Sequence, residues 1–227
     1  MSSLYLVAQP IFKVNNKAKE IIAYELLLRS NKNDRFPLME FQALIMERNS
    51  NSELLNWYYK EILMIVSKTK KIINVNIQPQ QLFYEETFNM LNKLAEHSSQ
   101  LCIEITEYDT NSSIQDNSQF FLLCMIKRLK KIGFLVALDD VGTGIHTLNN
   151  ILPLLNEVDV IKFSILPFNK KTKDEGLFLA SCWNKLAQAK GIEFVVEGIE
   201  DGEMEKELIE CEAFLQQGFY LGKPVRI

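Results

Sequence analysis

Apolar residues recur along the chain in short runs that alternate with longer stretches of helical periodicity. The strand-like runs lie at residues 4–12, 21–28, 72–77, 101–105, 134–138, 158–161, 192–196 and 213–219. Helical patterns lie at about 37–48, 52–66, 80–97, 118–131, 173–190 and 203–210, and Pro37 and Ser52 are expected to open the first two. Residues 13–19 form a polar turn, so the first two strands are expected to pair as a hairpin. This alternation predicts a closed α/β barrel, a TIM-like (β/α)8 fold, rather than an open doubly wound sheet.

Nearly every strand-like run closes on a carboxylate, an amide or a lysine. In chain order these residues are Glu25, Asn76, Glu104, Asp139 with Asp140, Lys162, Glu197 and Gln217. The carboxyl ends of barrel strands converge on one face, where enzymes of this architecture carry their chemistry. The pattern therefore predicts a single oxygen-rich site, which suits a hard cation such as magnesium, manganese or calcium.

Composition narrows the class of protein. The chain has 227 residues, 47% hydrophobic and 24% charged, which suits one soluble domain over residues 1–227. The formal net charge of −4 provides no basic field, so long nucleic acid is not expected as a partner. A small phosphorylated ligand remains compatible with this charge, because a bound metal inverts the local sign. The sequence also lacks the glycine-rich phosphate-binding motifs GxGxxG and GxxxxGK[ST].

Cysteine and histidine usage points to the cytoplasm. Cys102, Cys124, Cys182 and Cys211 have no paired spacing and are predicted to be reduced core residues. Two histidines are too few for a histidine-ligated zinc or iron cluster, and His146 is expected at the surface. No apolar run approaches membrane-spanning length, and the first residues lack a basic leader, so neither export nor membrane insertion is expected.

Eight short segments carry a family resemblance. They are Gln9-Pro10-Ile11, Tyr24-Glu25-Leu26-Leu27-Leu28-Arg29, Asn74-Val75-Asn76, Glu104-Ile105-Thr106-Glu107, Asp139-Asp140-Val141-Gly142-Thr143-Gly144, Lys162, Glu197-Gly198-Ile199-Glu200 and Gln217-Gly218. Each is weak alone, but in this order and at strand ends they resemble the EAL domain, the bacterial phosphodiesterase that linearises cyclic di-GMP. The similarity covers the chain from Gln9 to Pro224.

The resemblance implies a barrel with an irregular first strand pair and a centre for two divalent cations, Mg²⁺ or Mn²⁺. By correspondence, the metal ligands are Glu25, Asn76, Glu104, Asp139, Asp140 and Glu197. Lys162 corresponds to the lysine that contacts the attacking water, and Glu107 to the acid that steadies the loop after the aspartate pair. Gln9, Arg29 and Gln217 correspond to residues that hold the substrate or its water. The implied partners are cyclic di-GMP and a second copy in a homodimer.

The chemistry of phosphodiester hydrolysis agrees with these roles. Two cations about 3.5–4 Å apart activate water, align it and neutralise charge on the phosphoryl oxygens. The carboxylates that hold such ions repel one another in their absence. Neighbouring aspartates reach two ions only if the strand unwinds, and Gly142 and Gly144 supply that freedom. Arg29 offers a two-pronged donor for phosphate.

Several departures from the family pattern bear on loop order, dimer coupling and rate more than on metal capacity. Val141 replaces an aromatic residue, Ser164 replaces an acid two residues after Lys162, and Gln78 replaces a serine after the metal asparagine. The loop continues as Ile145-His146-Thr147-Leu148 instead of the commoner aromatic-serine-serine-leucine. The chain also ends soon after the last strand, so a final helix is missing and one flank is a candidate surface for an unidentified protein partner.

Alternative interpretations stay open at this point. The carboxylates are also compatible with salt bridges, the aspartate pair with a helix cap, and Lys162 with a side chain that reaches solvent. A rival function is a catalytically weak or inactive module that binds cyclic di-GMP or a protein. A rival of another class is a barrel glycosidase with Glu104 and Glu197 as acid and nucleophile, although Asn76 and Lys162 have no part in that mechanism.

Overall fold

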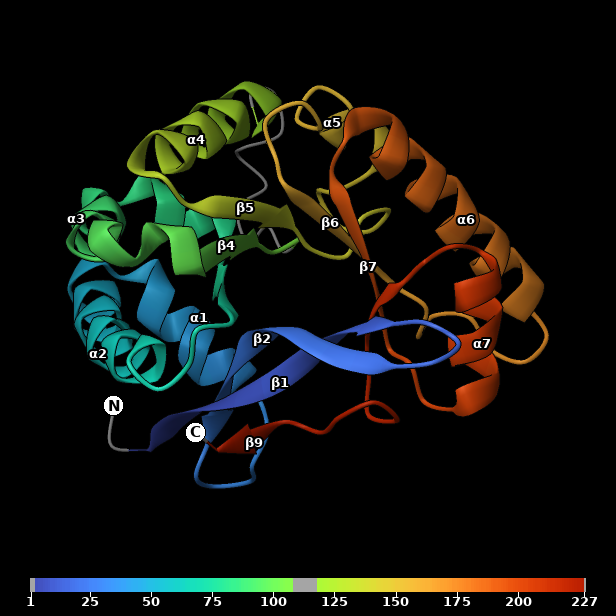
Figure 1. Ribbon diagram of the computed structural model, residues 1–227. Helices are drawn as coiled ribbons and strands as arrows, with labels where there is room; N and C mark the ends of the chain where they lie inside the picture. Colours follow the sequence, from blue (N-terminus) through green and yellow to red (C-terminus); the bar gives the residue numbers. More distant parts are fainter. Residues whose placement is uncertain (1–2, 108–117, 227) are drawn as a thin grey trace.

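The computed structural model describes residues 3–107 and 118–226, and within them a closed barrel of strands is surrounded by helices (Figure 1). The barrel strands are β1 (Leu4–Val14), β2 (Lys19–Ser30), β3 (Ile72–Ile77), β4 (Leu101–Ile105), β5 (Leu135–Leu138), β6 (Val160–Ser164), β7 (Glu193–Glu197) and β8 (Leu215–Gln217). Neighbours from β2 to β8 pair in parallel, and β1 closes the barrel antiparallel to both β8 and β2. The predicted barrel is confirmed, including the irregular first strand pair.

The predicted hairpin of β1 and β2 is confirmed. Asn15 makes its turn by accepting the backbone N–H groups of Lys17 and Ala18. The register sets Gln9 opposite Glu25, and a bulge follows between Ile11 and Phe12. A short strand not predicted from the sequence, β9 (Val225–Arg226), pairs with the other edge of β1.

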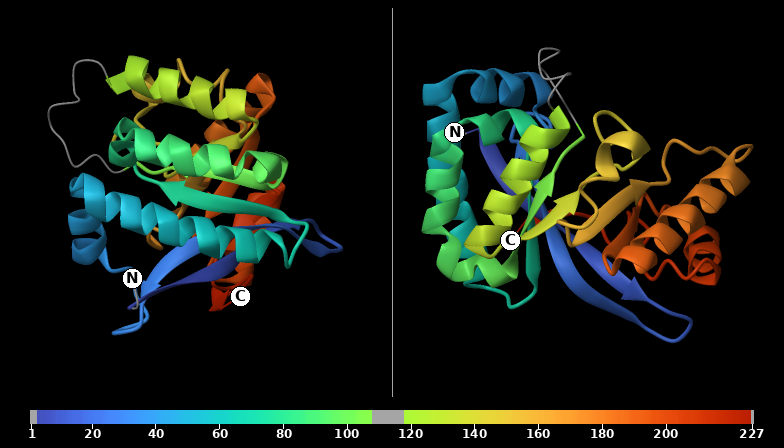
Figure 2. Two further views of the ribbon diagram at one scale, coloured as in Figure 1. Left: turned by 90° about the vertical axis from the view of Figure 1, so that its left-hand side faces the viewer. Right: turned by 90° about the horizontal axis from the view of Figure 1, so that it is seen from above.

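Helices line the outside of the barrel. They are α1 (Leu38–Met46), α2 (Arg48–Val66), α3 (Glu85–Lys93), α4 (Ser118–Ile132), α5 (Leu148–Ile151), α6 (Lys173–Lys190) and α7 (Gly202–Glu210), with 3-10 turns η1 (Pro79–Phe83) and η2 (Ala95–Gln100). Figure 2 shows α2, α3 and α4 side by side along one side of the barrel. Among the described residues, every helix is too short or too polar to span a bilayer.

Two helix boundaries differ from the prediction. The second helix begins at Arg48, because Glu47 and not Ser52 caps it by accepting the N–H groups of Asn49 and Ser50. The helix predicted over 80–97 is divided into η1, α3 and η2. The first break lies at Tyr84, whose extended backbone ends the turn that Pro79 begins.

Two apolar cores lie on the two sides of the barrel wall. The larger packs the outer faces of the strands against the helices. The smaller fills one end of the interior with side chains from different strands, namely Ile11, Ala23, Cys102, Ala137, Val160 and Val195. Side chains alternate between faces of a strand with a period of two. The interior residues that follow are therefore those two positions later: Glu25, Glu104, Asp139, Lys162 and Glu197.

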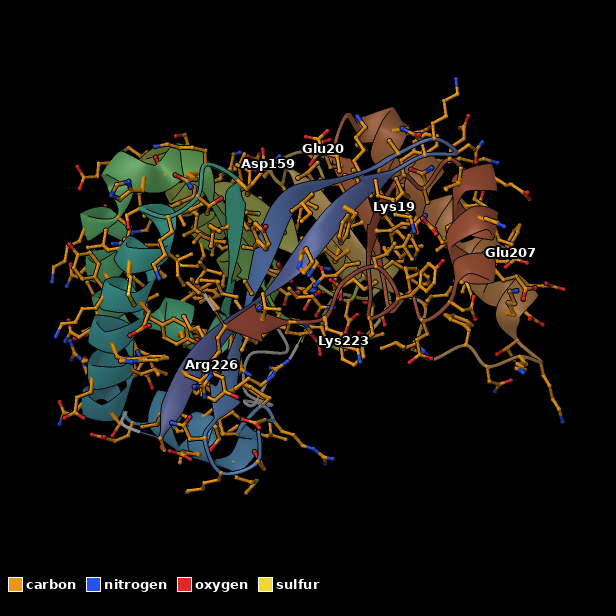
Figure 3. All side chains as sticks on the ribbon, turned by 60° about the horizontal axis from the view of Figure 1, so that its bottom comes forward. Lys19, Glu20, Asp159, Glu207, Lys223 and Arg226 are labelled. Atoms are coloured by element: carbon orange, nitrogen blue, oxygen red, sulfur yellow. The ribbon has the colours of Figure 1, made fainter. Side chains whose placement is uncertain are left out.

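The flank formed by the hairpin lies opposite the helices α3 and α4 (Figure 1). Figure 3 turns this flank toward the viewer, with Arg226 on β9 and Lys19 near the tip of the hairpin. Lys19 reaches across to Glu205 of α7 at 2.8 Å, which ties the hairpin to that helix. Within the described chain, β9 and not a helix lies against β1 here. A protein partner on this flank stays a prediction.

The cysteine prediction holds in part. All four thiols are free, and Cys102 is buried in the barrel interior. Cys124 and Cys211 are half-buried, whereas Cys182 is exposed on α6. The prediction of a core position was wrong for this residue.

Candidate active site

Lys162 lies at the centre of the polar half of the barrel. Its side chain has no solvent exposure, and its Nζ contacts carboxylates of Glu104 and Glu197 directly. Glu25 Oε2 lies 3.3 Å and Asp139 Oδ1 lies 3.6 Å from the same nitrogen. Burial lowers the pKa of Lys162, but the surrounding carboxylates outweigh it and the net pKa is raised well above its ordinary value. The ammonium is therefore charged and stabilises the acids around it.

Glu25 is held by two amides as well as by Lys162. Asn76 donates to its Oε1 at 2.8 Å, and Gln217 donates to its Oε2 at 2.6 Å. Burial raises the pKa of Glu25, but Lys162 and the two amide donors bring the net pKa below its ordinary value. Because Asn76 donates through nitrogen, its amide oxygen is left to ligate a cation.

Asn74 is a site residue that the sequence reasoning missed. It lies on the same inward face of β3 as Asn76, and its Nδ2 donates to Glu104 Oε2 at 3.0 Å. The spacing Asn-Val-Asn was the available indication, because residues two apart on a strand share a face. Burial, followed by the neighbouring acids, raises the pKa of Glu104 well above its ordinary value despite Lys162.

The site contains two carboxylate clusters whose members each offer an oxygen within 4.8 Å of the others. The first cluster is Glu25, Glu104 and Glu197, and the second cluster is Glu107, Asp139 and Asp140. Asp139 also lies beside Lys162, which contacts the acids of the first cluster, so Asp139 connects the two clusters. Burial and the neighbouring acids raise the pKa of Glu197 to about 8 and that of Asp140 to about 7. Such elevated values show that each cluster favours a proton or a cation.

The donor set fits hard divalent cations. Carboxylate and amide oxygens are the ligands that Mg²⁺, Mn²⁺ and Ca²⁺ take. Asp140 Oδ1 is buried without a hydrogen-bond partner among the described residues, as an oxygen aimed at an ion would be. Asp140 itself has a φ of 44°, a left-handed conformation that L-residues seldom adopt, and it separates the two adjacent aspartate side chains.

Glu107 contributes to the second cluster through its side chain and to the following loop through its backbone. Its carbonyl oxygen accepts the N–H of Ile145 at 3.0 Å. Gly144 passes so close that a Cβ there would lie 2.2 Å from that oxygen, which explains the glycine. The contact between Glu107 and the loop is thus independent of the carboxylate.

Two clefts open on either side of Glu25. One of about 280 Å³ is lined by polar groups of Arg29, Asn76, Gln78 and Asp139 and by the apolar side chains of Phe36 and Leu38. The other, of about 210 Å³, is lined by Gln9, Glu197, Gln217 and Phe219. Gln9 also donates to the Gly222 carbonyl at 3.3 Å, and Gln78 is the residue that directly precedes η1. An elongated ligand can therefore cross Glu25 and extend into both clefts.

Val141 directly follows the aspartate pair, and its side chain packs beneath the loop that they begin. Its N–H donates to the Lys162 carbonyl at 2.9 Å, and its side chain is buried. It lines an apolar cavity of about 480 Å³ together with Phe163, Phe168 and Trp183, and Ser164 opens on the same space. The short side chain thus leaves room between the loop and α6.

Comparisons with known proteins agree on one family. The EAL domain matches residues 2–224 of the chain. Probable cyclic di-GMP phosphodiesterase PdeG of Escherichia coli K12 is 28% identical over 196 residues, which are 83% of this chain and 37% of that protein. Cyclic di-GMP phosphodiesterase PdeR of the same organism is 27% identical over 220 residues, 91% of this chain and 32% of PdeR. The chain spans about a third of the length of these relatives.

Solved structures share the fold. Complexes of Klebsiella pneumoniae BlrP1 with cyclic di-GMP and calcium or manganese align with TM-scores of 0.76 and 0.71. Both are 22% identical to the chain and cover 98% of it, while the alignment covers 56% of BlrP1.

Proposed function

The chain belongs to the EAL domain family, and from that premise we propose that it is a metal-dependent phosphodiesterase that hydrolyses cyclic di-GMP to linear pGpG. The observation that carries the proposal is the pair of carboxylate clusters joined by Asp139 around a buried lysine. Divalent cations, when bound, supply an activated water and neutralise charge on the phosphate. Glu25, Asn76, Glu104 and Glu197 would hold one cation and Asp140 the other, with Asp139 placed between the two carboxylate clusters.

The residues of the chain then divide the remaining tasks. Water attacks the phosphorus of one phosphodiester, the P–O3′ bond breaks, and the departing 3′ oxygen takes up a proton. Lys162 offsets the mutual repulsion of the acids of the first cluster and places a positive charge beside the attacking water. Arg29 in one cleft and Gln9 in the other hold the two halves of the cyclic dinucleotide, and Gln217 fixes Glu25 between them. Glu107 positions the loop through its backbone and completes the second cluster through its carboxylate.

We also propose that the protein forms a homodimer and acts in the cytoplasm. Leu148 of α5 and Leu179 of α6 are exposed apolar side chains that line the same cavity, which supports a homodimer through this face. Light scattering tests this assembly against the chain mass of 26.3 kDa. The free thiols support the cytoplasm as the site of action, and fractionation of cells tests it.

Chromatography of the reaction products tests the activity. Purified protein with cyclic di-GMP and Mn²⁺ or Mg²⁺ is expected to release pGpG, and Ca²⁺ and chelator are expected to suppress the reaction. Glu25→Gln should abolish turnover, whereas Glu20→Gln, an exposed glutamate on the same strand, should leave it unchanged. Nucleotide binding without pGpG would favour the non-catalytic module. Full turnover in excess chelator would exclude the metal mechanism. A glycosidase is disfavoured because Glu104 is fully buried and cannot contact a sugar.

A further inference from the structure

His146 is buried within the active-site loop, contrary to the surface position predicted from the sequence. Its side chain has no solvent exposure. Its backbone closes the loop in both directions: the N–H donates to Thr143 O at 2.8 Å, and the carbonyl accepts the N–H of Gly142 at 2.7 Å. Thr143 in turn donates to Asp140 O at 3.1 Å. Three backbone hydrogen bonds within residues 140–146 therefore hold this loop in one compact conformation.

The imidazole turns back from this loop to the aspartate pair. His146 Nδ1 lies within hydrogen-bond distance of the Asp139 carbonyl oxygen. Because a carbonyl only accepts, Nδ1 carries the proton and the imidazole donates. Nε2 is then an acceptor, and it is buried without a partner among the described residues.

This contact fixes the peptide between the two aspartates. The Asp139 carbonyl of this peptide is held by His146, and its N–H, which is that of Asp140, donates to Asp139 Oδ1 at 3.0 Å. The preceding peptide is anchored by the Asp139 N–H, which donates to Ile105 O on β4 at 3.0 Å. The next residue, Asp140, has the left-handed φ of 44°. Such a conformation persists only where surrounding contacts over-determine it. Turning the peptide would send the Asp140 side chain away from Glu107, with which it forms the second cluster.

We infer that His146 is a positioning residue that holds the Asp139 carbonyl so that Asp139 and Asp140 face the two halves of a divalent-cation centre. The inference rests on the proposed function for the identity of that centre. It adds a role for a side chain that neither ligates the ion nor touches the substrate. Partners that orient ligands from behind typically change metal affinity by 10–100-fold when they are replaced.

Metal binding to the nucleotide-free protein separates this role from packing. Asparagine places an amide donor near the position of Nδ1, whereas glutamine places it near Nε2 and leucine fills the space without a donor. Calorimetry with Mn²⁺ should show two ions for wild type and for His146→Asn. The weaker of the two should lose about tenfold or more in affinity in His146→Gln and His146→Leu. His97→Leu, at the half-exposed second histidine, is the matched control and should match wild type.

A spectroscopic measurement on the unmodified protein tests the contact itself. Only two histidines contribute to ¹⁵N–¹H imidazole spectra, so His146 is assigned by difference from His97→Leu. Nδ1–H on His146 is expected, and an Nε2–H tautomer would overturn the inference. Equal Mn²⁺ affinity in the asparagine, glutamine and leucine variants would also overturn it, and so would a wild type that binds fewer than two ions. A wild type that binds two Mn²⁺ without cleaving cyclic di-GMP would refute the proposed function and leave the role of His146 standing.

Discussion

Lys162 carries one buried positive charge that is shared among the acids of the first cluster and Asp139. A buried charge is tolerated only when it is paired and hydrogen-bonded, because desolvation costs several kcal/mol per ion. The ammonium of Lys162 is stabilised by the surrounding carboxylates, and it in turn reduces the repulsion between them. The arrangement keeps mutually repelling carboxylates close together, and that proximity is the requirement for binding cations.

Lys162→Met should reveal this dependence. Methionine keeps much of the volume but leaves the acids without their counter-charge. The free energy of unfolding of the metal-free variant should therefore be lower than that of wild type by about 3–5 kcal/mol. Added Mn²⁺ should restore part of the loss, while turnover should fall by about 10²-fold. Lys71→Met, which removes an exposed pair with Glu20, should cost below about 1 kcal/mol in the same denaturant titration. Equal losses for the two variants would contradict the central role of Lys162.

The raised pKa of Glu197 predicts a pH dependence of stability. Its pKa in the folded protein is about 8 against an ordinary value of 4.5, so the folded state binds a proton that the unfolded state releases. That contribution is complete below the ordinary value and is lost as pH rises through about 8. The pKa of Asp140 at about 7 acts in the same direction. The melting temperature of the metal-free protein should therefore fall across this window.

Glu197→Gln isolates the effect. Its melting temperature should depend less on pH between about 5 and 8 than that of wild type, since the amide does not titrate. Glu193→Gln, an exposed position on the same strand, should follow wild type. Identical profiles for wild type and Glu197→Gln would show that the proton is not held at this carboxylate.

At the scale of elements, the sequence pattern predicted the boundaries of some strands more accurately than those of the helices. β3 and β4 were predicted residue for residue, because each is a short, mainly apolar run with a polar site residue, Asn76 or Glu104, at its second-last position. β6 instead extends through Lys162 to Ser164, since the surrounding acids make a buried lysine compatible with a strand interior. The division of 80–97 depends on the backbone at Tyr84, and no periodicity encodes it.

The sequence was likewise insufficient to identify every residue of the candidate site. The residue types of the two carboxylate clusters followed from the order of polar strand ends and from the resemblance, and their role as cation ligands stays a prediction. The positions of Asn74 and His146 did not, because their roles depend on contacts with Glu104 and with the Asp139 carbonyl that only the folded chain creates. The role of such a buried polar residue depends on which groups it contacts in the folded chain, and the residue type alone does not indicate those contacts.

Val141→Phe should make the enzyme faster and more stable. The cavity of about 480 Å³ beside Val141 has room for a larger ring. Each added methylene that becomes buried contributes roughly 0.8 kcal/mol, and a better-packed loop should hold Asp140 more firmly. The initial rate of cyclic di-GMP loss at saturating Mn²⁺ should therefore rise. Leu186→Phe fills the same cavity from α6 and should leave the rate unchanged. A slower Val141→Phe enzyme would show that this loop is not rate-limiting.

At the scale of the molecule, barrel closure brings together residues that are far apart in the chain. Gln217 on β8 donates to Glu25 on β2, across the antiparallel strand β1 that joins the two ends of the parallel array. Inside the barrel, the apolar layer fills one end and the polar site lies at the other end. Burial of the apolar layer therefore positions the polar side chains at the mouth of the barrel. The polar residues that close the strand runs predicted the polar face, whereas β9 at the edge of β1 was not predicted, because two residues carry too little pattern.

Anomalous diffraction at the manganese edge from crystals grown with Mn²⁺ tests the central claim most directly. The account predicts two peaks about 3.5–4 Å apart. One should lie among Glu25, Asn76, Glu104 and Glu197, and the other beside Asp140 and Glu107, with Asp139 between them. A single peak, or peaks remote from these two carboxylate clusters, would contradict a two-cation centre in this barrel.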